Sequence, residues 1–116
     1  MENLTQQQRI AVMRILLDIL LIDNKIDARE IDFFNKVNEE LQLPEEAFTE
    51  VKEQNSLLAL AQIRDFTQEQ KEEFAQLMGK MIAADENIHY KEVAIYNVVR
   101  DFCAIDLEFD EQEYPF

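Results

Sequence analysis

Two short acidic segments hold the side chains of this sequence that are best suited to binding a cation. The first runs from Asp23 to Glu30, and the second runs from Asp85 to Glu92, at an offset of 62 residues (85 minus 23). In that register aspartate matches aspartate, glutamate matches glutamate, and an isoleucine stands four residues before each glutamate. A repeat of this kind predicts that one helix–loop–helix unit occurs twice in the chain.

A metal-binding interpretation gives each segment three candidate ligands. They are Asp23, Asp27 and Glu30 in the first segment and Asp85, His89 and Glu92 in the second. Carboxylate oxygens suit hard divalent cations, and two or three protein ligands leave most coordination positions to water. We therefore expect at most a weakly bound divalent cation, calcium or magnesium.

Neither segment is an EF-hand. When Glu30 is set at the last position of such a loop, Ile19 and Leu21 occupy the places of the first two carboxylates. The second segment has apolar residues in the same two places. Asn24 and Glu86 replace the glycine that the sharp turn requires, and both residues disfavour a left-handed turn.

A structural interpretation accounts for the same carboxylates. Asp27 followed by Glu30 has the pattern of a capping box, in which two side chains satisfy backbone amides of the first helical turn. His89 holds the cap position of the second segment as an exposed residue, and Glu92 follows three residues later. Negative groups there complement the helix dipole, and such a cap contributes about 1 kcal/mol. Capping and metal binding both stay open.

Catalysis is the alternative function for the second segment, as a metal-dependent hydrolase that uses Asp85, His89 and Glu92. His89 is the only histidine of the chain, and general-base catalysis would need a nucleophile and an orienting partner that the sequence does not mark. The sequence also has no glycine-rich phosphate loop, nucleophile elbow or cysteine–histidine cluster. We therefore expect a protein that is not an enzyme.

The elements that position these segments are helices. One glycine and two prolines among 116 residues are too few for the turns of a β-sandwich or barrel, and 47% hydrophobic residues fill one core. We predict an all-α, single-domain bundle of about six to seven helices with an internal pseudo-two-fold repeat. Its central helices begin at capping boxes formed by Thr5 with Gln8 and by Thr67 with Gln70. The second helix of each half folds back over them.

Apolar periodicity predicts which side chains point inward. The helix after Asp27 presents Ile31, Phe34, Val37 and Leu41 on one face. The short helix from Glu45 to Gln54 should direct Phe48 and Val51 to the core, and Cys103 should be a buried structural thiol.

Charge and cysteine content limit the partners. With 25 acidic and 11 basic side chains, the net charge is −14, which repels nucleic acids and anionic lipids. The apolar segments are too short and too interrupted, for example by Asp18, for direct membrane insertion. A single cysteine excludes an intramolecular disulfide, and the N-terminus lacks a signal-peptide pattern. We expect a cytoplasmic protein-interaction or stress-response module with a protein partner, and a purely structural or regulatory subunit stays open as an alternative.

The sequence from Ile10 to Ile105 resembles the TerB-like tellurite-resistance family. The resemblance rests on Ala-Ala-Asp-Glu-Asn-Ile, two further residues and Lys-Glu between apolar helices, against a family loop of Ala-Asp-Gly-x-Ile-x-x-x-Glu. It implies an all-helical fold with internal two-fold symmetry, metal-binding acidic loop residues, and roles in stress-response or membrane-associated complexes. The matching acidic positions are Asp23, Glu30, Asp85 and Glu92.

The predicted organisation is a TerB-like helical domain over residues 1–106 and an acidic, aromatic tail over residues 107–116. The tail alternates acidic and large apolar side chains. Two interpretations of it stay open, a strap packed across the bundle and a mobile terminus.

Overall fold

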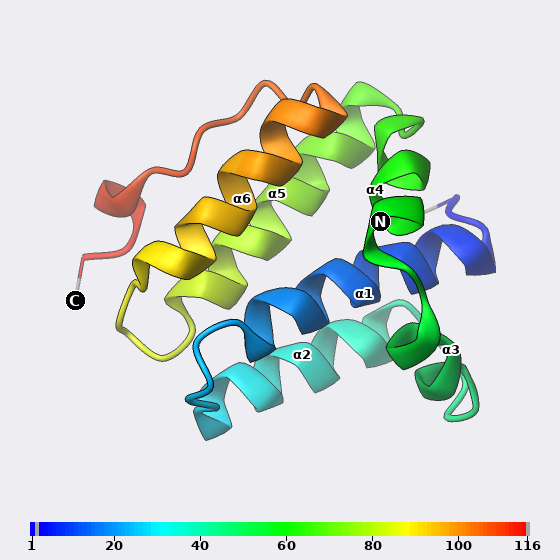
Figure 1. Cartoon of the computed structure of the whole chain (residues 1–116), viewed down its shortest axis with the longest axis horizontal. Helices are drawn as coiled ribbons and strands as arrows, with labels where there is room; N and C mark the ends of the chain where they lie inside the picture. The colour runs from blue at the N-terminus through cyan, green and yellow to red at the C-terminus, as the bar shows by residue number, and fades with distance from the viewer. Residues whose placement is uncertain (2, 116) are drawn as a thin grey trace.

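The computed structural model describes Met1 and residues 3–115, and these residues form six α-helices and one short 3-10 helix, with no strand among them (Figure 1). The prediction of an all-α, single-domain helical bundle is confirmed. The helices are α1 (Gln6–Leu21), α2 (Ala28–Glu40), α3 (Ala47–Glu53), α4 (Ser56–Arg64), α5 (Gln68–Ala83) and α6 (Tyr90–Cys103), and the 3-10 helix is η1 (Glu111–Glu113).

Capping boxes begin both long helices, as the sequence predicts. The Gln8 amide donates to Thr5 Oγ1 over 3.2 Å, and the Thr5 amide donates to Gln8 Oε1 over 2.9 Å. Thr67 and Gln70 repeat this exchange at 3.1 and 2.9 Å at the start of α5. These four bonds satisfy amides that would otherwise lack partners in the first turn.

Helix α1 lies at the centre of the bundle and contacts α2, α3, α4 and α5. Its apolar side chains occupy most of its circumference, and nine of its residues are buried. Helix α5 buries one face, with seven of its 16 residues buried, and α6 packs against α5 and α4. A helix that is apolar nearly all round must be covered on several sides, which explains the central position of α1.

The two acidic loops follow corresponding helices. Helices α1 and α5 each have 16 residues, and their starts, like the starts of α2 and α6, differ by the same 62 residues as the acidic segments (68 minus 6 and 90 minus 28). The loops after α1 and after α5 lie at the same end of the molecule, on the left in Figure 1.

Two predicted inward side chains are only partly covered. Ile31, in the first turn of α2, keeps 41% of its surface exposed, and Phe48 keeps 39%. The Phe48 ring packs edge-on against Phe34 with centroids 6.3 Å apart, while the Lys52 ammonium lies 5.2 Å from its centre. Phe48 thus covers the outer side of Phe34 instead of entering the core.

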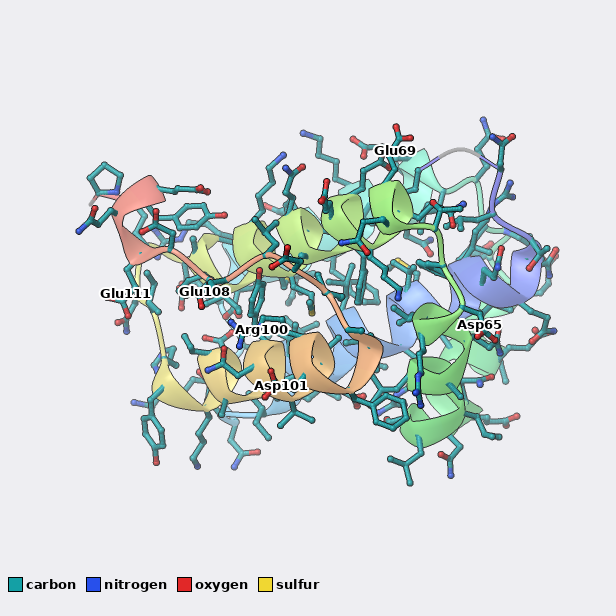
Figure 2. The ribbon with its side chains drawn as sticks, turned by 90° about the horizontal axis from the view of Figure 1, so that it is seen from above. Asp65, Glu69, Arg100, Asp101, Glu108 and Glu111 are labelled. Atoms are coloured by element: carbon teal, nitrogen blue, oxygen red, sulfur yellow. The ribbon has the colours of Figure 1, made fainter. Side chains whose placement is uncertain are left out.

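The tail packs as a strap along α5 and α6, which decides between its two predicted states. Arg100 and Glu108 form an ion pair of 3.4 Å (Figure 2), and the Tyr96 hydroxyl donates to the Leu107 carbonyl over 2.7 Å. A Cβ on Gly79 would lie 2.7 Å from the Tyr114 hydroxyl oxygen, so the tail passes close to the α5 backbone there. The last tail residue, 116, lies outside the described residues.

Cys103 is fully buried, as the sequence predicts, and its thiol donates to the Leu60 carbonyl over 3.4 Å. Burial raises the pKa of this thiol to about 11, which keeps it protonated and unreactive. Among the helices of the described residues, none combines the length and the hydropathy that a membrane span requires.

Candidate metal centre

Both acidic loops turn at a residue in the left-handed conformation. Asn24 has a φ of 60° and Glu86 has a φ of 59°. The sequence predicts that both residues disfavour such a turn, and the chain nevertheless adopts it at both positions. For a residue with a Cβ atom this conformation costs about 1–2 kcal/mol, which the packing of the flanking helices must offset.

The first aspartate of each loop is held by the backbone of its own loop. Asp23 Oδ1 accepts the Lys25 amide over 3.1 Å, and Asp85 Oδ1 accepts the Asn87 amide over 3.0 Å. Each side chain is only 9% exposed. The backbone thus fixes both carboxylates and leaves their Oδ2 atoms free to face the space between the loops.

His89 lies between these two aspartates. Its Nε2 atom is 3.3 Å from Asp23 Oδ2 and 3.9 Å from Asp85 Oδ2. His89 does occupy the N-cap position of α6, but its side chain makes no capping hydrogen bond and is 28% exposed. The ring has turned from the helix end towards carboxylates of both loops, which differs from the exposed cap that the sequence predicts.

Glu30 and Glu92 lie near Asp23 and Asp85, and both are fully buried. Glu30 Oε1 accepts the Asp27 amide over 3.3 Å, while Glu30 Oε2 and both carboxylate oxygens of Glu92 have no hydrogen-bond partner among the described residues. A buried ionised carboxylate without a partner is costly, so it must hold a proton or a cation.

The pKa values of the two glutamates express this cost. Burial raises the pKa of Glu92 to about 9, and the neighbouring Glu30 carboxylate adds to the effect. Burial also raises the pKa of Glu30, although the bond from the Asp27 amide acts in the opposite direction. The two carboxyl groups lie next to each other and both pKa values are raised, so this pair holds a proton at neutral pH.

Three side chains meet the spatial requirement for a shared metal ion. One potential ligand atom from each of Asp23, His89 and Glu92 lies within 4.8 Å of the other two. Two ligands of a tetrahedral ion with bonds of about 2.1 Å are roughly 3.4 Å apart, close to the 3.3 Å between His89 Nε2 and Asp23 Oδ2. One imidazole and two carboxylates fit zinc or manganese.

Asp27 does not join the other candidate ligands. Arg29 occupies both of its oxygens, with Nε 3.0 Å from Oδ1 and Nη2 3.1 Å from Oδ2. The hydrogen bond from this side chain lowers the pKa of Asp27. Asp27 also forms the predicted capping box with Glu30 at the start of α2. It therefore serves the helix end and is not part of the group formed by Asp23, His89 and Glu92.

The candidate ligands thus form one shared cluster, whereas the sequence hypothesis placed a separate set in each loop. Asp23 and His89 are 66 positions apart in the chain (89 minus 23), and no local spacing links them. The 62-residue repeat was the available signal, because two equivalent loops at the same end of a bundle can meet. Arg29 adds another link between the loops, with Nη1 3.8 Å from Glu86 Oε2.

Comparison with known proteins extends the description of the fold. No family model matches the sequence, and no curated protein matches it. The structure is similar to the crystal structure of a protein of unknown function from Porphyromonas gingivalis, with a TM-score of 0.75 and 18% sequence identity over 94% of this chain and 91% of that chain. The chain therefore has a helical fold similar to that of this protein.

Proposed function

We propose that this chain is a non-enzymatic helical domain of the TerB-like type, which binds one divalent cation between its two acidic loops. The observation that carries the proposal is Glu92, a fully buried carboxylate next to Asp23 and His89, with no hydrogen-bond partner on either oxygen among the residues that the structure describes. A divalent cation would replace the proton that Glu92 otherwise holds, and it would supply the missing partner.

The donor set favours zinc or manganese over calcium or magnesium. Calcium and magnesium take oxygen ligands almost entirely, while an imidazole nitrogen suits first-row transition metals. His89 supplies that nitrogen, and Asp23 and Glu92 supply oxygens. Asp85 Oδ2, 3.9 Å from His89 Nε2, adds negative charge beside the site.

The role of such an ion would be to join the loops. It would connect the end of α1, through Asp23, to the start of α6, through His89 and Glu92. Glu30 and Glu92 are fully buried and cannot contact a substrate in this conformation. The large groove nearby is lined by Ile22 and Tyr90 but by neither Asp23 nor His89. These features support a protein-interaction domain instead of a hydrolase.

Isothermal titration calorimetry of the metal-free protein with Mn²⁺, Zn²⁺, Ca²⁺ and Mg²⁺ tests the proposal. We expect one ion per chain, with Mn²⁺ or Zn²⁺ binding more tightly than Ca²⁺ or Mg²⁺. Asp23→Asn should weaken this single event, and Asp27→Asn is the matched control, because it removes the same charge four residues along the same loop without touching the cluster.

Two results would overturn the proposal. One is the absence of binding heat with all four cations at millimolar concentration. The other is a stoichiometry of two ions per chain with Asp23→Asn and Asp27→Asn equally impaired, which would restore a separate site in each loop.

A further inference from the structure

The tail segment 106–115 lies on a face of α5 and α6 that matches it, defined by Gly79, Tyr96 and Arg100 (Figure 1). Gly79 is the only glycine of the chain and lies inside α5, where glycine is unfavourable relative to alanine. A Cβ at this position would lie 2.7 Å from the Tyr114 hydroxyl oxygen, so the absent side chain leaves space for the tyrosine. A residue that weakens the helix thus has its counterpart in the tail.

Helix α6 presents further groups to the same segment. The Tyr96 hydroxyl, on a residue that is 2% exposed, donates to the Leu107 carbonyl over 2.7 Å. The Tyr96 ring meets Phe109 edge-on, with centroids 5.6 Å apart. Arg100 points from α6 towards Glu108 (Figure 2) and pairs with it at 3.4 Å. The two helices thus recognise an acidic residue that an aromatic residue follows.

Few bonds hold the tail on this face. Within the part of the chain that the structure describes, no backbone–backbone hydrogen bond joins residues 106–115 to a helix. Leu107, Phe109 and Tyr114 are only partly buried, and the Glu108 side chain is 85% exposed. The segment carries five acidic and no basic side chains in a chain of net charge −14, so charge repulsion opposes its docking. Such a segment can leave by local opening while the helices stay folded.

The connection between α6 and the tail carries backbone strain. Ala104 ends α6 with φ 56° and ψ 49°, a left-handed conformation that is unfavourable for a residue with a Cβ atom. Residues 105–110 follow without regular secondary structure, and six extended residues span about 20 Å. A short strained connection favours exchange of the segment that it carries between identical chains, because opening relieves the strain and the same contacts form in the partner.

We propose that this α5–α6 face binds the tail of a second copy of the chain in exchange for its own tail. Each contact described above would then form between two copies instead of within one. The occupant is a second copy because its tail supplies the same carbonyl, carboxylate and rings in the same order. Both copies are acidic, so salt, which screens their repulsion, should favour the exchange. The inference does not depend on the proposed cation.

Two variants that each lack one half of the contact test the proposal. The tail variant, Phe109→Ser/Tyr114→Ser, removes both rings from the tail and leaves the face intact. The face variant, Gly79→Leu/Arg100→Gln, fills the space beside α5 with a good helix former, removes the counter-ion of Glu108 and leaves the tail intact. Only a mixture of the two variants contains both an intact tail and an intact face.

Sedimentation velocity of the full-length variants, alone and mixed in equal amounts at about 0.3 M salt, measures their association. We expect each variant alone to be monomeric and the mixture to form a 1:1 complex. A mixture that stays monomeric at submillimolar concentration would overturn the proposal. Self-association of either variant as strong as that of the mixture would also overturn it, because the contact would then lie elsewhere.

The matched control for the tail variant is Tyr90→Ser/Phe102→Ser, which removes the same two residue types from exposed positions of α6. Tyr90 lines the groove between α1 and α6, and Phe102 lies against Arg64, so neither belongs to the tail contact. Mixed with the face variant, this control should associate severalfold more weakly than the tail variant does, because its own tail competes for its face. Equal association would overturn the proposal.

A second measurement keeps the test independent of the folding of the face variant, which circular dichroism checks. A labelled synthetic peptide of residues 106–115 should bind the tail variant severalfold more tightly than it binds the wild type, whose own tail competes. Fluorescence anisotropy measures both affinities. Equal affinities, or no binding to a folded tail variant, would overturn the proposal.

The hinge gives a third measurement. Ala104→Gly removes the strain from the closed connection, so it should raise the dissociation constant of the wild-type dimer at least tenfold, since each dimer contains two hinges. A dimer that is equally stable in Ala104→Gly would overturn the exchange, and so would a wild-type chain that stays monomeric up to millimolar concentration.

Calorimetric titration of the tail variant with Mn²⁺ separates this inference from the proposed cation site. Failure of the two variants to associate, with intact Mn²⁺ binding, would remove the tail exchange alone. Association of the variants without any cation binding by the wild type would overturn the cation site and leave the tail exchange standing.

Discussion

The loop before α2 and the loop before α6 begin with the same pattern but use their polar side chains differently. In the first loop, Asp27 accepts hydrogen bonds at the helix start and pairs with Arg29, while Glu30 completes the capping box. In the second loop, His89 makes no side-chain capping bond, and Glu92 has no hydrogen-bond partner in the described part of the chain. The first loop begins its helix with a complete capping box, and the second begins its helix without a side-chain cap.

The difference arises from one substitution at the cap position. A carboxylate at Asp27 is a good acceptor for backbone amides, so it stays at the end of its helix. The imidazole of His89 is a poorer cap, and it points instead to Asp23, which belongs to the other loop. Corresponding positions of the two loops therefore differ, because Asp27 caps its own helix and His89 contacts the other loop.

The largest expected difference between the two loops is in how the free energy of unfolding of the metal-free protein depends on pH. The folded pKa of Glu92, about 9, lies above its ordinary value of 4.5, so the folded state keeps a proton that the unfolded state has lost. The stability that this bound proton contributes is fully present below pH 4.5 and is lost as the pH rises towards 9. The loss amounts to a few kcal/mol in the free energy of unfolding. Asp27, whose pKa is lowered, contributes in the opposite direction and loses its effect only in acid.

Urea unfolding in the presence of a chelator from pH 5 to pH 9 measures this effect. Glu92→Gln keeps a neutral side chain of the same shape, so its stability should vary much less over that range. A wild-type protein with the same pH profile as Glu92→Gln would show that Glu92 is ionised at ordinary pH and has a partner in solution.

The second prediction concerns the cation itself. Glu92→Gln should weaken binding of Mn²⁺ or Zn²⁺ by roughly 100-fold, equivalent to about 2.7 kcal/mol, because an amide oxygen is a much poorer ligand than a carboxylate. Glu30→Gln should weaken it less, since Glu30 Oε1 already accepts the Asp27 amide. Calorimetry of the two variants side by side gives the comparison, and equal losses would mean that both glutamates coordinate the ion.

Much of the fold could be predicted from the sequence, because its signals are local. Thr5 with Gln8 and Thr67 with Gln70 mark helix starts through contacts only three residues apart. The candidate site was less accessible, since Asp23 meets His89 only through the packing of the bundle. The left-handed turn at Glu86 was missed for the same reason, because tertiary packing overrode the local preference of a residue with a Cβ atom.

A third prediction compares the removal of the side chain at each of the two cap positions. Asp27→Ala should lower the melting temperature by a few degrees through the lost capping bonds and leave the cation affinity unchanged. His89→Ala should change the melting temperature of the metal-free protein little, because His89 makes no capping bond, but should weaken Zn²⁺ binding at least tenfold. Thermal unfolding and calorimetry on both variants measure the two effects, and the reverse pattern would contradict the division of roles.

The smallest expected effect compares the two left-handed residues. Glycine adopts a positive φ without the steric cost of a Cβ atom, but it also increases the entropy of the unfolded chain. For Glu86→Gly the relief of strain should exceed that entropy term and raise the free energy of unfolding by about 0.5–1 kcal/mol. Asn24→Gly should change it by only a few tenths of a kcal/mol, because asparagine tolerates this conformation better than glutamate does.

Urea unfolding of the metal-free variants, with the wild type as reference, is the measurement. A gain for Asn24→Gly equal to that for Glu86→Gly would mean that both loops carry the same backbone strain and differ only in their side chains. A loss for Glu86→Gly would mean that the ion pair between Arg29 and Glu86 stabilises the contact between the loops more than the left-handed turn strains it.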